Sequence, residues 1–427
     1  MTGPTTAAWP APQAGSPVRA TVRLPGSKSQ TNRALVLAAI ARTPTTLVQP
    51  LVSRDTALMA GGLRSLGIEV DERNGDWLVT PHPMTGPATV DVGNAGTVMR
   101  FLPPLACFAQ GDVTFDGDPR ARQRPLAPVV RALRDLSADI TATDDRLPLT
   151  VHGRGWLLGG SVVIDASLSS QFVSALLLAA PRCADAVEVR HVGGRLPSGA
   201  HIDMTVEMLR AAGAVVEHVD DQAWRVEPGP VELGRLHVEP DLSNAAPFLA
   251  AAVVTGGRVT VPGWPMRTTQ AGDALRRLLP RFGATVEQDD GGITVTGPGT
   301  IEGADLDLGD VGELAPVLAA VCALASTPSR LRGIAHLRHH ETDRLAAIAT
   351  EITALGGDVR ETDDGLELRP RRLHGGVVAT YDDHRLATMA AVLGLRVGGI
   401  EIADVATTAK TMPGFADLWS RMLADQP

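Results

Sequence analysis

Lysine is nearly absent from this sequence: of its 39 lysine and arginine residues, only Lys28 and Lys410 are lysines. Arginine is a broad planar fork that stays charged, whereas lysine is a compact ammonium whose pKa shifts when it is desolvated. A site that needs a point charge against a small anion, or a group that shares a proton, does not accept arginine freely. The alternative explanation is codon bias, with two lysines left by accident. Both lysines lie in polar loops that introduce a helix, LPGSKSQTNRA and TTAKTMPGF, which favours a functional reason.

Aromatic residues and cysteines are also scarce. Aromatic residues make up 3% of the chain, with a single tyrosine, so the core must be built from Ala, Leu and Val. Cys107, Cys183 and Cys322 are widely spaced and lack the spacing of metal ligands. Cys107 and Cys322 lie in apolar helical runs and are predicted to be core residues in a reducing compartment. No other group of His, Cys and Asp has metal spacing, and we expect neither a metal nor a cofactor.

Signals for a membrane, a nucleic acid or a nucleotide are missing as well. No apolar run reaches membrane-spanning length, and the net charge of −9 argues against a nucleic-acid partner. No GxGxxG or Walker loop follows a strand. The first 17 residues lack the charged start and apolar middle of a signal peptide. We therefore expect a cytoplasmic protein in which these residues form a loose N-terminal arm.

The chain does contain an internal repeat, which occurs six times at intervals of roughly 70 residues. The first half of each repeat is a polar loop followed by a helix of small apolar residues. The six versions begin SKSQTNRALVLAAI, GNAGTVMRFLPPLA, SLSSQFVSALLLAA, DLSNAAPFLAAAVV, GDVGELAPVLAAVCAL and YDDHRLATMAAVLGL. A β-rich segment, an amphipathic helix and a hairpin follow, and the last repeat stops after its helix. The pattern predicts βαβαββ-like units of an α/β protein, with helices covering sheets.

Glycines mark the ends of these predicted elements. Gly67, Gly213 and Gly283 end the second helices of three repeats. The pairs Asn74-Gly75 and Asp364-Gly365 are typical of hairpin turns. At 427 residues, the chain is long enough for two or three domains.

The polar loops that open the first helices predict anion binding. A helix N-terminus carries unpaired N–H groups and the positive end of the helix dipole. Asn32, Asn94 and Asn244 lie in these loops, and ordinary N-capping is the alternative for any one of them. Basic residues cluster beside the same loops: Lys28, Arg33, Arg100, Arg120 to Arg124, Arg338 to Arg344, His384, Arg385 and Lys410. The sequence therefore predicts a small substrate that bears several negative charges.

Two further groups of side chains suit chemistry on such a substrate. Ser167, Ser169, Ser170 and Gln171 open a helix and offer hydroxyl and main-chain donors to a phosphate. Glu341 and Asp343 lie among His339, His340 and Arg344, a setting for a tuned proton carrier, with capping or an ordinary salt bridge as the alternative. Glu313 starts an apolar helix, where the helix dipole favours a carboxylate in any case.

The motifs LPGSKSQTNRAL, GNAGTVMRF, DGDPRARQRP, SSQF, HETDRL, YDDHR and AKTMPGF resemble those of the 5-enolpyruvylshikimate-3-phosphate synthase family, in order from about Leu24 to the C-terminus. The resemblance implies an inside-out α/β barrel fold of two domains, each with three βαβαββ repeats and with a cleft between them. One domain would comprise residues 25–240, and the other residues 1–24 together with 241–427.

The implied reaction transfers the enolpyruvyl group of phosphoenolpyruvate to the 5-hydroxyl of shikimate 3-phosphate, by addition and elimination through a tetrahedral intermediate. Both substrates are small anions, in agreement with the charge pattern. The resemblance implies no cofactor, metal, nucleic acid or membrane, and we expect a monomer. The two retained lysines would then meet across the cleft.

The resemblance also assigns site residues. The catalytic residues would be Lys28, shared by both substrates, Glu313, facing the 5-hydroxyl, Glu341, exchanging a proton with the methylene carbon, and His384, a helper near the phosphate. The shikimate 3-phosphate site would comprise Lys28, Ser29, Arg33, Ser169, Ser170, Gln171, Ser198, Glu313 and His340. The phosphoenolpyruvate site would comprise Lys28, Asn94, Gly96, Arg124, Gln171, Arg344, His384, Arg385 and Lys410.

Three positions depart from the pattern of the family. His340 stands where many members have lysine, so its contact with the 3-phosphate would depend on pH. Glu313 replaces a common aspartate and moves the carboxylate by one methylene. His201 replaces a frequent tyrosine. Each change alters affinity for shikimate 3-phosphate without removing a required group.

Two other functions remain open at this point. A sister family transfers enolpyruvyl to a UDP-linked N-acetylglucosamine and commonly has a cysteine in the loop that corresponds to DGDPRARQRP, which has none here. A non-catalytic anion-binding scaffold is the second alternative, but it gives no reason for both lysines, Glu313 and Glu341. Gly96 leaves room for glyphosate-like compounds, and sensitivity to them is a hypothesis.

Overall fold

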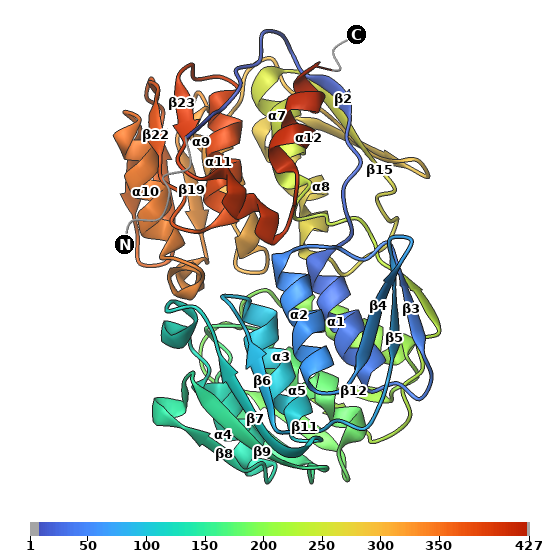
Figure 1. Ribbon diagram of the computed structural model, residues 1–427. Helices are drawn as coiled ribbons and strands as arrows, with labels where there is room; N and C mark the ends of the chain where they lie inside the picture. Colours follow the sequence, from blue (N-terminus) through green and yellow to red (C-terminus); the bar gives the residue numbers. More distant parts are fainter. Residues whose placement is uncertain (1–7, 425–427) are drawn as a thin grey trace. The chain divides into compact units, whose positions relative to one another are not determined.

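The computed structural model describes residues 8–424 of the chain. The chain divides into two compact units (Figure 1). Gly26–Val238 forms one, here called the internal unit. Met1–Pro25 and Glu239–Pro427 together form the other, here called the terminal unit. The chain therefore passes from one unit to the other twice.

The internal unit contains two kinds of α-helix, as the repeat predicts. α1, α3 and α5 are buried over nearly their whole length and pack on one another, whereas α2, α4 and α6 bury one face. These helices are α1 (Lys28–Ala39), α2 (Arg54–Ser65), α3 (Gly96–Ala106), α4 (Ala127–Asp135), α5 (Gln171–Ala179) and α6 (Ala200–Ala211). The small apolar residues of the first kind suit a helix surrounded by other elements, because no face has to meet water.

Three four-stranded sheets complete the internal unit, in the orders β14-β3-β5-β4, β6-β7-β9-β8 and β10-β11-β13-β12. In each sheet the first two strands pair in parallel and the last two form an antiparallel hairpin. The strands are β3 (Thr45–Val48), β4 (Glu69–Arg73), β5 (Asp76–Thr80), β6 (Ala88–Asp91), β7 (Gln110–Asp116), β8 (Ile140–Ala142), β9 (Leu149–Arg154), β10 (Gly160–Ile164), β11 (Val187–His191), β12 (Val216–Asp220), β13 (Ala223–Val226) and β14 (Arg235–His237). The segment from β6 to β9 is one complete βαβαββ repeat.

The terminal unit repeats this plan around α7, α9 and α11, which are buried and pack on one another. Its helices are α7 (Ala246–Thr255), α8 (Leu275–Leu278), α9 (Ala315–Ala323), α10 (Arg344–Ala354), α11 (His384–Gly394) and α12 (Phe415–Ala424). Its sheets have the orders β16-β17-β15-β2, β18-β19-β21-β20 and β1-β23-β22. The strands are β1 (Trp9–Pro10), β2 (Arg19–Thr21), β15 (Arg258–Pro262), β16 (Thr285–Asp289), β17 (Gly292–Thr296), β18 (Asp305–Asp307), β19 (Ser329–Arg332), β20 (Asp358–Glu361), β21 (Leu366–Arg369), β22 (Gly376–Val378) and β23 (Ile400–Ile402).

In two repeats the first strand comes from a distant part of the chain. β14 pairs in parallel with β3 and completes the first repeat, and β2 pairs in parallel with β15 and completes the fourth. These two strands lie next to the points where the chain changes units. Within its own unit, each of these two strands is therefore held by a ladder of main-chain hydrogen bonds.

The expectation of a loose N-terminal arm is wrong for the residues that the structure describes, while residues 1–7 lie outside them. β1 pairs antiparallel with β23, where the other five sheets have a hairpin strand. The Ala11 N–H donates to the Ile400 oxygen at 2.9 Å, and the Trp9 ring meets the Phe415 ring edge to face. Within residues 8–424 the last repeat shows no hairpin of its own, and β1 covers the strand edge that would otherwise be exposed.

Most glycine and hairpin predictions are confirmed, with two corrections. Gly67, Gly213 and Gly283 have φ values of 92°, 89° and 88° at helix ends. The helix before Gly283 is divided into a 3-10 turn, α8 and a second 3-10 turn, and α8 ends where Pro280 lacks the backbone N–H that would continue it. Asn74 and Gly75, with φ of 55° and 84°, form the expected two-residue turn. The other hairpin has a four-residue loop, 362–365, whose glycine instead allows close approach to the Leu331 carbonyl.

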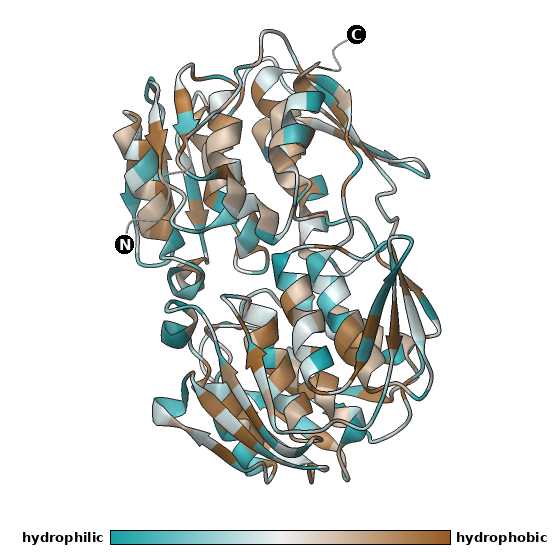
Figure 2. Cartoon of the chain, viewed as in Figure 1, coloured by the Kyte–Doolittle hydropathy of each residue, from teal (hydrophilic) through white to brown (hydrophobic). Residues whose placement is uncertain are grey.

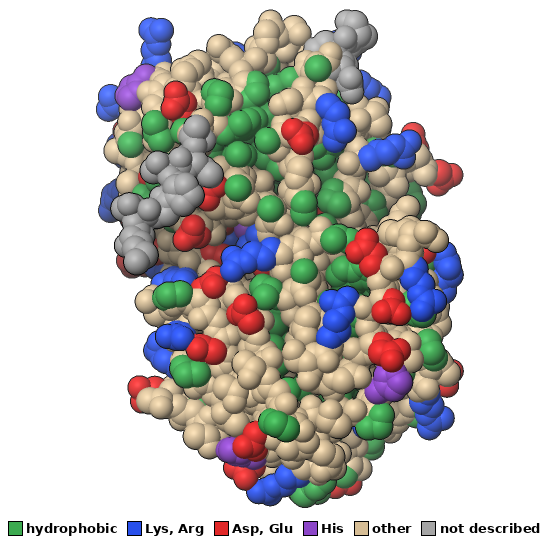
Figure 3. All heavy atoms as spheres, viewed as in Figure 1, with side chains coloured by type: hydrophobic (Ala, Val, Ile, Leu, Met, Phe, Trp, Pro, Cys, Tyr) green, Lys and Arg blue, Asp and Glu red, His purple; other side chains and the backbone are tan. Residues whose placement is uncertain are grey.

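Apolar residues line the interior of both units. In Figure 2, brown residues gather on α9 and α11, while β7 and β9 alternate between brown and teal. Cys107, Cys183 and Cys322 are buried, and burial raises the pKa of each thiol to about 12. On the face drawn in Figure 3, acidic and basic side chains are interspersed on each unit. Among residues 8–424, no helix is both long and apolar enough to cross a bilayer.

Candidate functional site

The residues predicted to bind substrate fall into two groups, one in each unit. The internal unit holds Lys28, Ser29, Arg33, Asn94, Gly96, Arg124, Ser169, Ser170, Gln171 and Ser198. The terminal unit holds Glu313, His340, Glu341, Arg344, His384, Arg385 and Lys410. Most of them lie at or just before the first turn of a helix, where main-chain N–H groups are free for anions.

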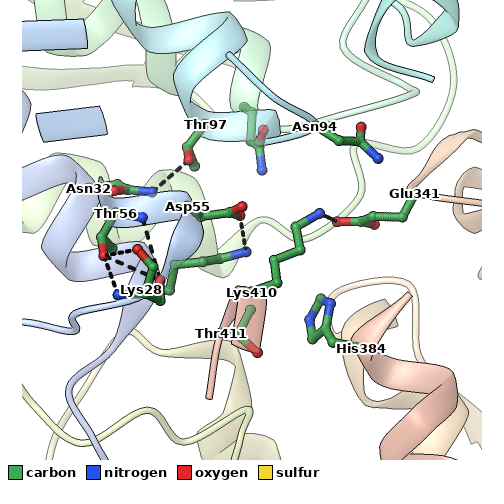
Figure 4. Close-up of polar contacts among 12 residues, drawn as sticks. Lys28, Asn32, Asp55, Thr56, Asn94, Thr97, Glu341, His384, Lys410 and Thr411 are labelled. Carbon is green, nitrogen blue, oxygen red and sulfur yellow. Dashed lines mark hydrogen bonds and ion pairs between the residues drawn. The ribbon is translucent and has the colours of Figure 1, made fainter. Parts of the chain in front are cut away.

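Lys28 is the first residue of α1, which Ser27 caps by accepting a hydrogen bond from the Gln30 N–H. Its Nζ lies 3.2 Å from Oδ2 of Asp55, a side chain only 3% exposed, whereas the Lys28 side chain is 20% exposed (Figure 4). A buried carboxylate therefore holds the ammonium while leaving part of it accessible. Sequence reasoning missed Asp55, because nothing local distinguishes it from an ordinary acid in the first turn of α2.

Asn94, Gly96 and Arg124 form one cluster at the start of α3. Arg124 Nη1 donates to the Asn94 main-chain oxygen at 2.8 Å and to Asn94 Oδ1 at 3.0 Å. A Cβ atom added to Gly96 would lie 2.8 Å from Arg124 Nη2. The glycine thus lets the guanidinium rest directly against the helix terminus. Arg124 is buried, so this is a fixed cation rather than a solvated surface charge.

Gln171, at the start of α5, is oriented by Arg100. Arg100 Nη1 donates to Gln171 Oε1 at 2.8 Å, and the guanidinium lies over the Phe172 ring, 5.1 Å from its centroid. Because Oε1 accepts from Arg100, the amide nitrogen of Gln171 is the atom that can donate to an anion. Sequence reasoning placed Arg100 in the basic cluster but gave it no separate role.

The predicted phosphate-binding serines lie in two loops. Ser169 Oγ accepts from the Gln171 N–H at 3.3 Å, and Ser170 is the residue before α5. Ser167 Oγ instead accepts from the Gly194 N–H at 2.8 Å and so braces a neighbouring loop. Ser198 has a φ of 53°, a left-handed conformation that is unusual for a non-glycine residue and is often found at functional sites.

Arg33 is held inside the internal unit. It is 1% exposed, and its guanidinium donates to Thr205 Oγ1 at 2.7 Å, the His201 oxygen at 2.9 Å and the Ser29 oxygen at 3.1 Å. It also lies over the Phe101 ring, 5.3 Å from the centroid. Burial lowers its pKa to about 9. These contacts brace α1 against α6, and a direct contact with substrate stays a prediction.

In the terminal unit, Glu341 lies between two cations (Figure 4 shows the first). Lys410 Nζ is 2.8 Å from Glu341 Oε1, and Arg344 Nη2 is 2.9 Å from Glu341 Oε2. The side chains of Glu341 and Lys410 are each 8% exposed. Capping does not explain Glu341, because Asp343 caps α10 by accepting from the Ala346 N–H.

Asp383 joins three of the predicted residues and was not identified from the sequence. It is fully buried and accepts from Arg344 Nε at 2.6 Å, from Arg344 Nη2 at 3.2 Å and from the Arg385 main-chain N–H at 2.9 Å. His384 Nδ1 lies 3.7 Å from the same carboxylate. Burial lowers the pKa of Arg344, but Asp383 and Glu341 outweigh it and raise the pKa overall. For Arg385, burial prevails and lowers the pKa.

Ser243 extends this network to Glu313. Arg385 Nη1 donates to the Ser243 oxygen at 2.9 Å, and Ser243 Oγ donates to Glu313 Oε1 at 3.2 Å. His340 is also attached, since its Nδ1 lies 3.1 Å from Arg344 Nη1. All seven predicted residues of the terminal unit thus belong to one continuous polar network.

One cavity in the described part of the terminal unit is a weaker candidate for the functional site. A cavity of about 980 Å³ lies at the C-terminal ends of α7, α9 and α11, and no predicted site residue lines it. Arg371, Arg372 and Arg396 are among its lining residues. Cations there complement the negative ends of helix dipoles, which explains the basic lining structurally. Within residues 8–424, no group of three or more His, Cys, Asp or Glu residues could hold a metal ion.

Taken residue by residue, the two clusters suit chemistry on small anions. The internal unit offers Lys28, the Arg124 guanidinium and serine hydroxyls beside helix N-termini. The terminal unit offers a carboxylate that two cations hold in place and that can exchange a proton with a bound molecule.

Comparisons with known proteins agree with this chemistry. Residues 12–419 match the family described as EPSP synthase (3-phosphoshikimate 1-carboxyvinyltransferase). A 3-phosphoshikimate 1-carboxyvinyltransferase from Kocuria rhizophila is 54% identical, over 98% of this chain and 97% of that protein.

Solved structures of related proteins share the fold. An EPSP synthase from Acinetobacter baumannii has a TM-score of 0.81 and 25% identity, covering 97% of this chain and 98% of that one. The enolpyruvyl transferase NikO from Streptomyces tendae has a TM-score of 0.77 at 17% identity, covers 96% of each chain, and shows the fold alone. These similarities confirm the enolpyruvyl transferase fold expected from the repeats and motifs.

Proposed function

The chain belongs to the EPSP synthase (3-phosphoshikimate 1-carboxyvinyltransferase) family, and we infer that it transfers the enolpyruvyl group of phosphoenolpyruvate to the 5-hydroxyl of shikimate 3-phosphate. The observation that carries this inference is the match over residues 12–419, together with 54% identity to a curated relative of that activity. The cationic clusters at helix starts support it, because both substrates are anions.

We propose that the residues divide between the substrates as the family resemblance implies. Lys28, Ser29, Arg33, Ser169, Ser170, Gln171, Ser198, Glu313 and His340 would bind shikimate 3-phosphate. Lys28, Asn94, Gly96, Arg124, Gln171, Arg344, His384, Arg385 and Lys410 would bind phosphoenolpyruvate. The residues that bind shikimate 3-phosphate and those that bind phosphoenolpyruvate would then serve one reaction.

The proposed reaction has an addition step and an elimination step. In the addition, the 5-oxygen forms a bond to C2 of phosphoenolpyruvate and gives up its proton towards Glu313, while Glu341 delivers a proton to the methylene carbon. In the elimination, the methyl carbon returns a proton to Glu341, the double bond forms again, and the C2–O bond breaks. The leaving phosphate takes up the proton that the 5-hydroxyl gave up, so both Glu313 and Glu341 return to their starting states. Lys28 and His384 offset the charge that develops on the oxygens.

Lys410 and Arg344 have a specific part in this scheme. Both contact the Glu341 carboxylate, at 2.8 and 2.9 Å, and both are proposed ligands of phosphoenolpyruvate. An incoming anion therefore competes with Glu341 for the same two cations. Loss of those partners weakens the stabilisation of the ionised carboxylate, which favours its proton-carrying form.

Phosphate release from phosphoenolpyruvate and shikimate 3-phosphate tests the proposal directly. Release is expected only when both substrates are present. Replacing shikimate 3-phosphate by UDP-N-acetylglucosamine should abolish it, and turnover with the UDP sugar would instead favour the sister activity. Absence of turnover with either acceptor would favour a non-catalytic scaffold. The monomeric state and cytoplasmic location stay predictions.

Gly96→Ala is expected to raise KM for phosphoenolpyruvate by about tenfold. The added methyl would meet Arg124 Nη2 at 2.8 Å, Arg100 Nη1 at 3.0 Å and Gln171 Oε1 at 3.1 Å, so the buried guanidinium must shift. Steady-state kinetics with each substrate varied in turn measure the effect. Inhibition by glyphosate, expected for the unsubstituted protein, should weaken in the same variant.

Gly61→Ala is the matched control for this substitution. Gly61 lies in α2, and a Cβ atom added there would have nothing within 4 Å. The change should leave both KM values unaltered and stabilise the helix by about 0.5–1 kcal/mol, since alanine is the better helix former. An unchanged KM for phosphoenolpyruvate in Gly96→Ala would contradict the placement of Arg124 at this substrate.

A further inference from the structure

Glu351 is a buried carboxylate that the proposed reaction does not use. It lies on α10, about two turns after Arg344, and so faces the same side of the helix. The residue is 6% exposed, although its side chain ends in a carboxyl group. Burial of a carboxylate is costly unless hydrogen bonds compensate it.

Both compensating bonds come from the loop before α11. Glu351 Oε2 accepts from the Ala379 main-chain N–H at 2.9 Å, and Oε1 accepts from the Tyr381 hydroxyl at 2.7 Å. Tyr381 is the only tyrosine in the chain. Tyr381 is 42% exposed, so its ring adds little to the hydrophobic core. Its hydroxyl group, by contrast, makes a direct hydrogen bond to the buried Glu351. The bond to Glu351 raises the pKa of Tyr381 to about 12.

The loop that Glu351 holds has an unfavourable backbone conformation. Tyr381 and Asp382 have φ values of 52° and 55°, two successive left-handed residues without a glycine. Such conformations persist only where surrounding contacts enforce them, and they occur often at functional sites. The next residue is Asp383, whose carboxylate holds Arg344 and the start of α11.

Side chains of helix α10 therefore form hydrogen bonds with this loop at two points. Arg344 binds Asp383 at one end of the loop, and Glu351 binds Ala379 and Tyr381 at the other. We propose that Glu351, acting through Tyr381, is a positioning residue that orients Asp383 and thereby sets Arg344, His384 and Arg385 for phosphoenolpyruvate. This inference rests on the proposed function, because it assigns these three residues to that substrate.

The test compares Glu351→Gln and Tyr381→Phe with the unsubstituted protein. Tyr381→Phe removes one hydroxyl and should raise KM for phosphoenolpyruvate about threefold, while Glu351→Gln should raise it about tenfold. KM for shikimate 3-phosphate should stay within about twofold. The double variant should resemble Glu351→Gln alone, because both changes break the same link.

Asp145→Asn is the matched control. Asp144 and Asp145 are also successive left-handed residues, with φ of 53° each, and the Asp145 carboxylate accepts hydrogen bonds from Arg131 and Arg134. This loop belongs to the internal unit and contains no predicted site residue. Asp145→Asn should lower the thermal midpoint without changing either KM, which separates general loop stability from positioning.

Two outcomes would overturn the inference. One is a lower thermal midpoint with no change in KM for phosphoenolpyruvate, and the other is an equal rise in both KM values. If the unsubstituted protein gave no turnover, the proposed function would fail first. Calorimetric affinity for phosphoenolpyruvate, with shikimate 3-phosphate present, would then decide: equal affinity of Glu351→Gln and the unsubstituted protein overturns the inference.

Discussion

Lys28→Arg is expected to lower kcat by about a thousandfold while the protein stays folded. The charge is conserved, so the effect depends on shape. Lys28 Nζ lies 3.2 Å from the buried Asp55 carboxylate. A guanidinium at this place would form a two-point bond with that carboxylate and present a broad plane where a compact ammonium now stands. Two substrates that share one small cation would both lose their contact.

Rates of phosphate release and circular dichroism of the purified variant measure the two parts of this expectation. Arg73→Lys is the control, because it makes the reverse exchange in an exposed pair, with 3.2 Å between Arg73 Nη2 and Asp71 Oδ2. It should change neither rate nor stability, as exposed pairs contribute about 0–1 kcal/mol. Near-normal turnover of Lys28→Arg would show that lysine was retained for reasons other than chemistry.

Glu341→Gln is expected to bind both substrates and to lower kcat by about a hundredfold to ten-thousandfold. The amide has nearly the shape of the carboxylate but cannot exchange a proton with the methylene carbon. It also removes the negative charge that Lys410 and Arg344 now contact at 2.8 and 2.9 Å. Neither cation is then attracted to a negative charge at residue 341, so the affinity for phosphoenolpyruvate should stay equal or increase.

Calorimetric affinities and single-turnover rates separate binding from chemistry in this variant. Glu361→Gln is the control, since Glu361 also pairs with an arginine, Arg338, but at 37% side-chain exposure and outside the polar network of Glu341. It should leave kcat unchanged. Full turnover by Glu341→Gln would exclude Glu341 as the proton carrier, and loss of phosphoenolpyruvate binding would assign it a structural role instead.

Much of the fold could be predicted because the same pattern of helices and strands occurs six times in the sequence. The buried helices α1, α3, α5, α7, α9 and α11 all begin within or just after the polar loops recognised in the sequence. The pairing of strands that are distant in the sequence was harder to derive from local patterns. β1 has only two residues, and its partner β23 lies almost four hundred residues later. The early end of α8 could have been expected from Pro280, which lies two residues after it.

The candidate site could be predicted only where a residue has a local signature. Lysines in a lysine-poor chain and basic residues at helix starts are visible in the sequence. Asp55, Asp383 and Ser243 are not, because their importance lies in partners distant along the chain. The bracing contacts of Arg33 have no local signature either. Its bonds to Thr205 and His201 arise only when α6 packs beside α1.

The origin of β1 and β2 has a consequence for how the chain is completed during synthesis. The internal unit is one continuous segment whose last strand, β14, ends at His237, so the ribosome delivers all of it before most of the other unit exists. β2 pairs with β15, and β1 pairs with β23, so both strands are translated before the internal unit but find their partners only in segments translated after it. Their hydrogen bonds therefore form later than those of the internal unit.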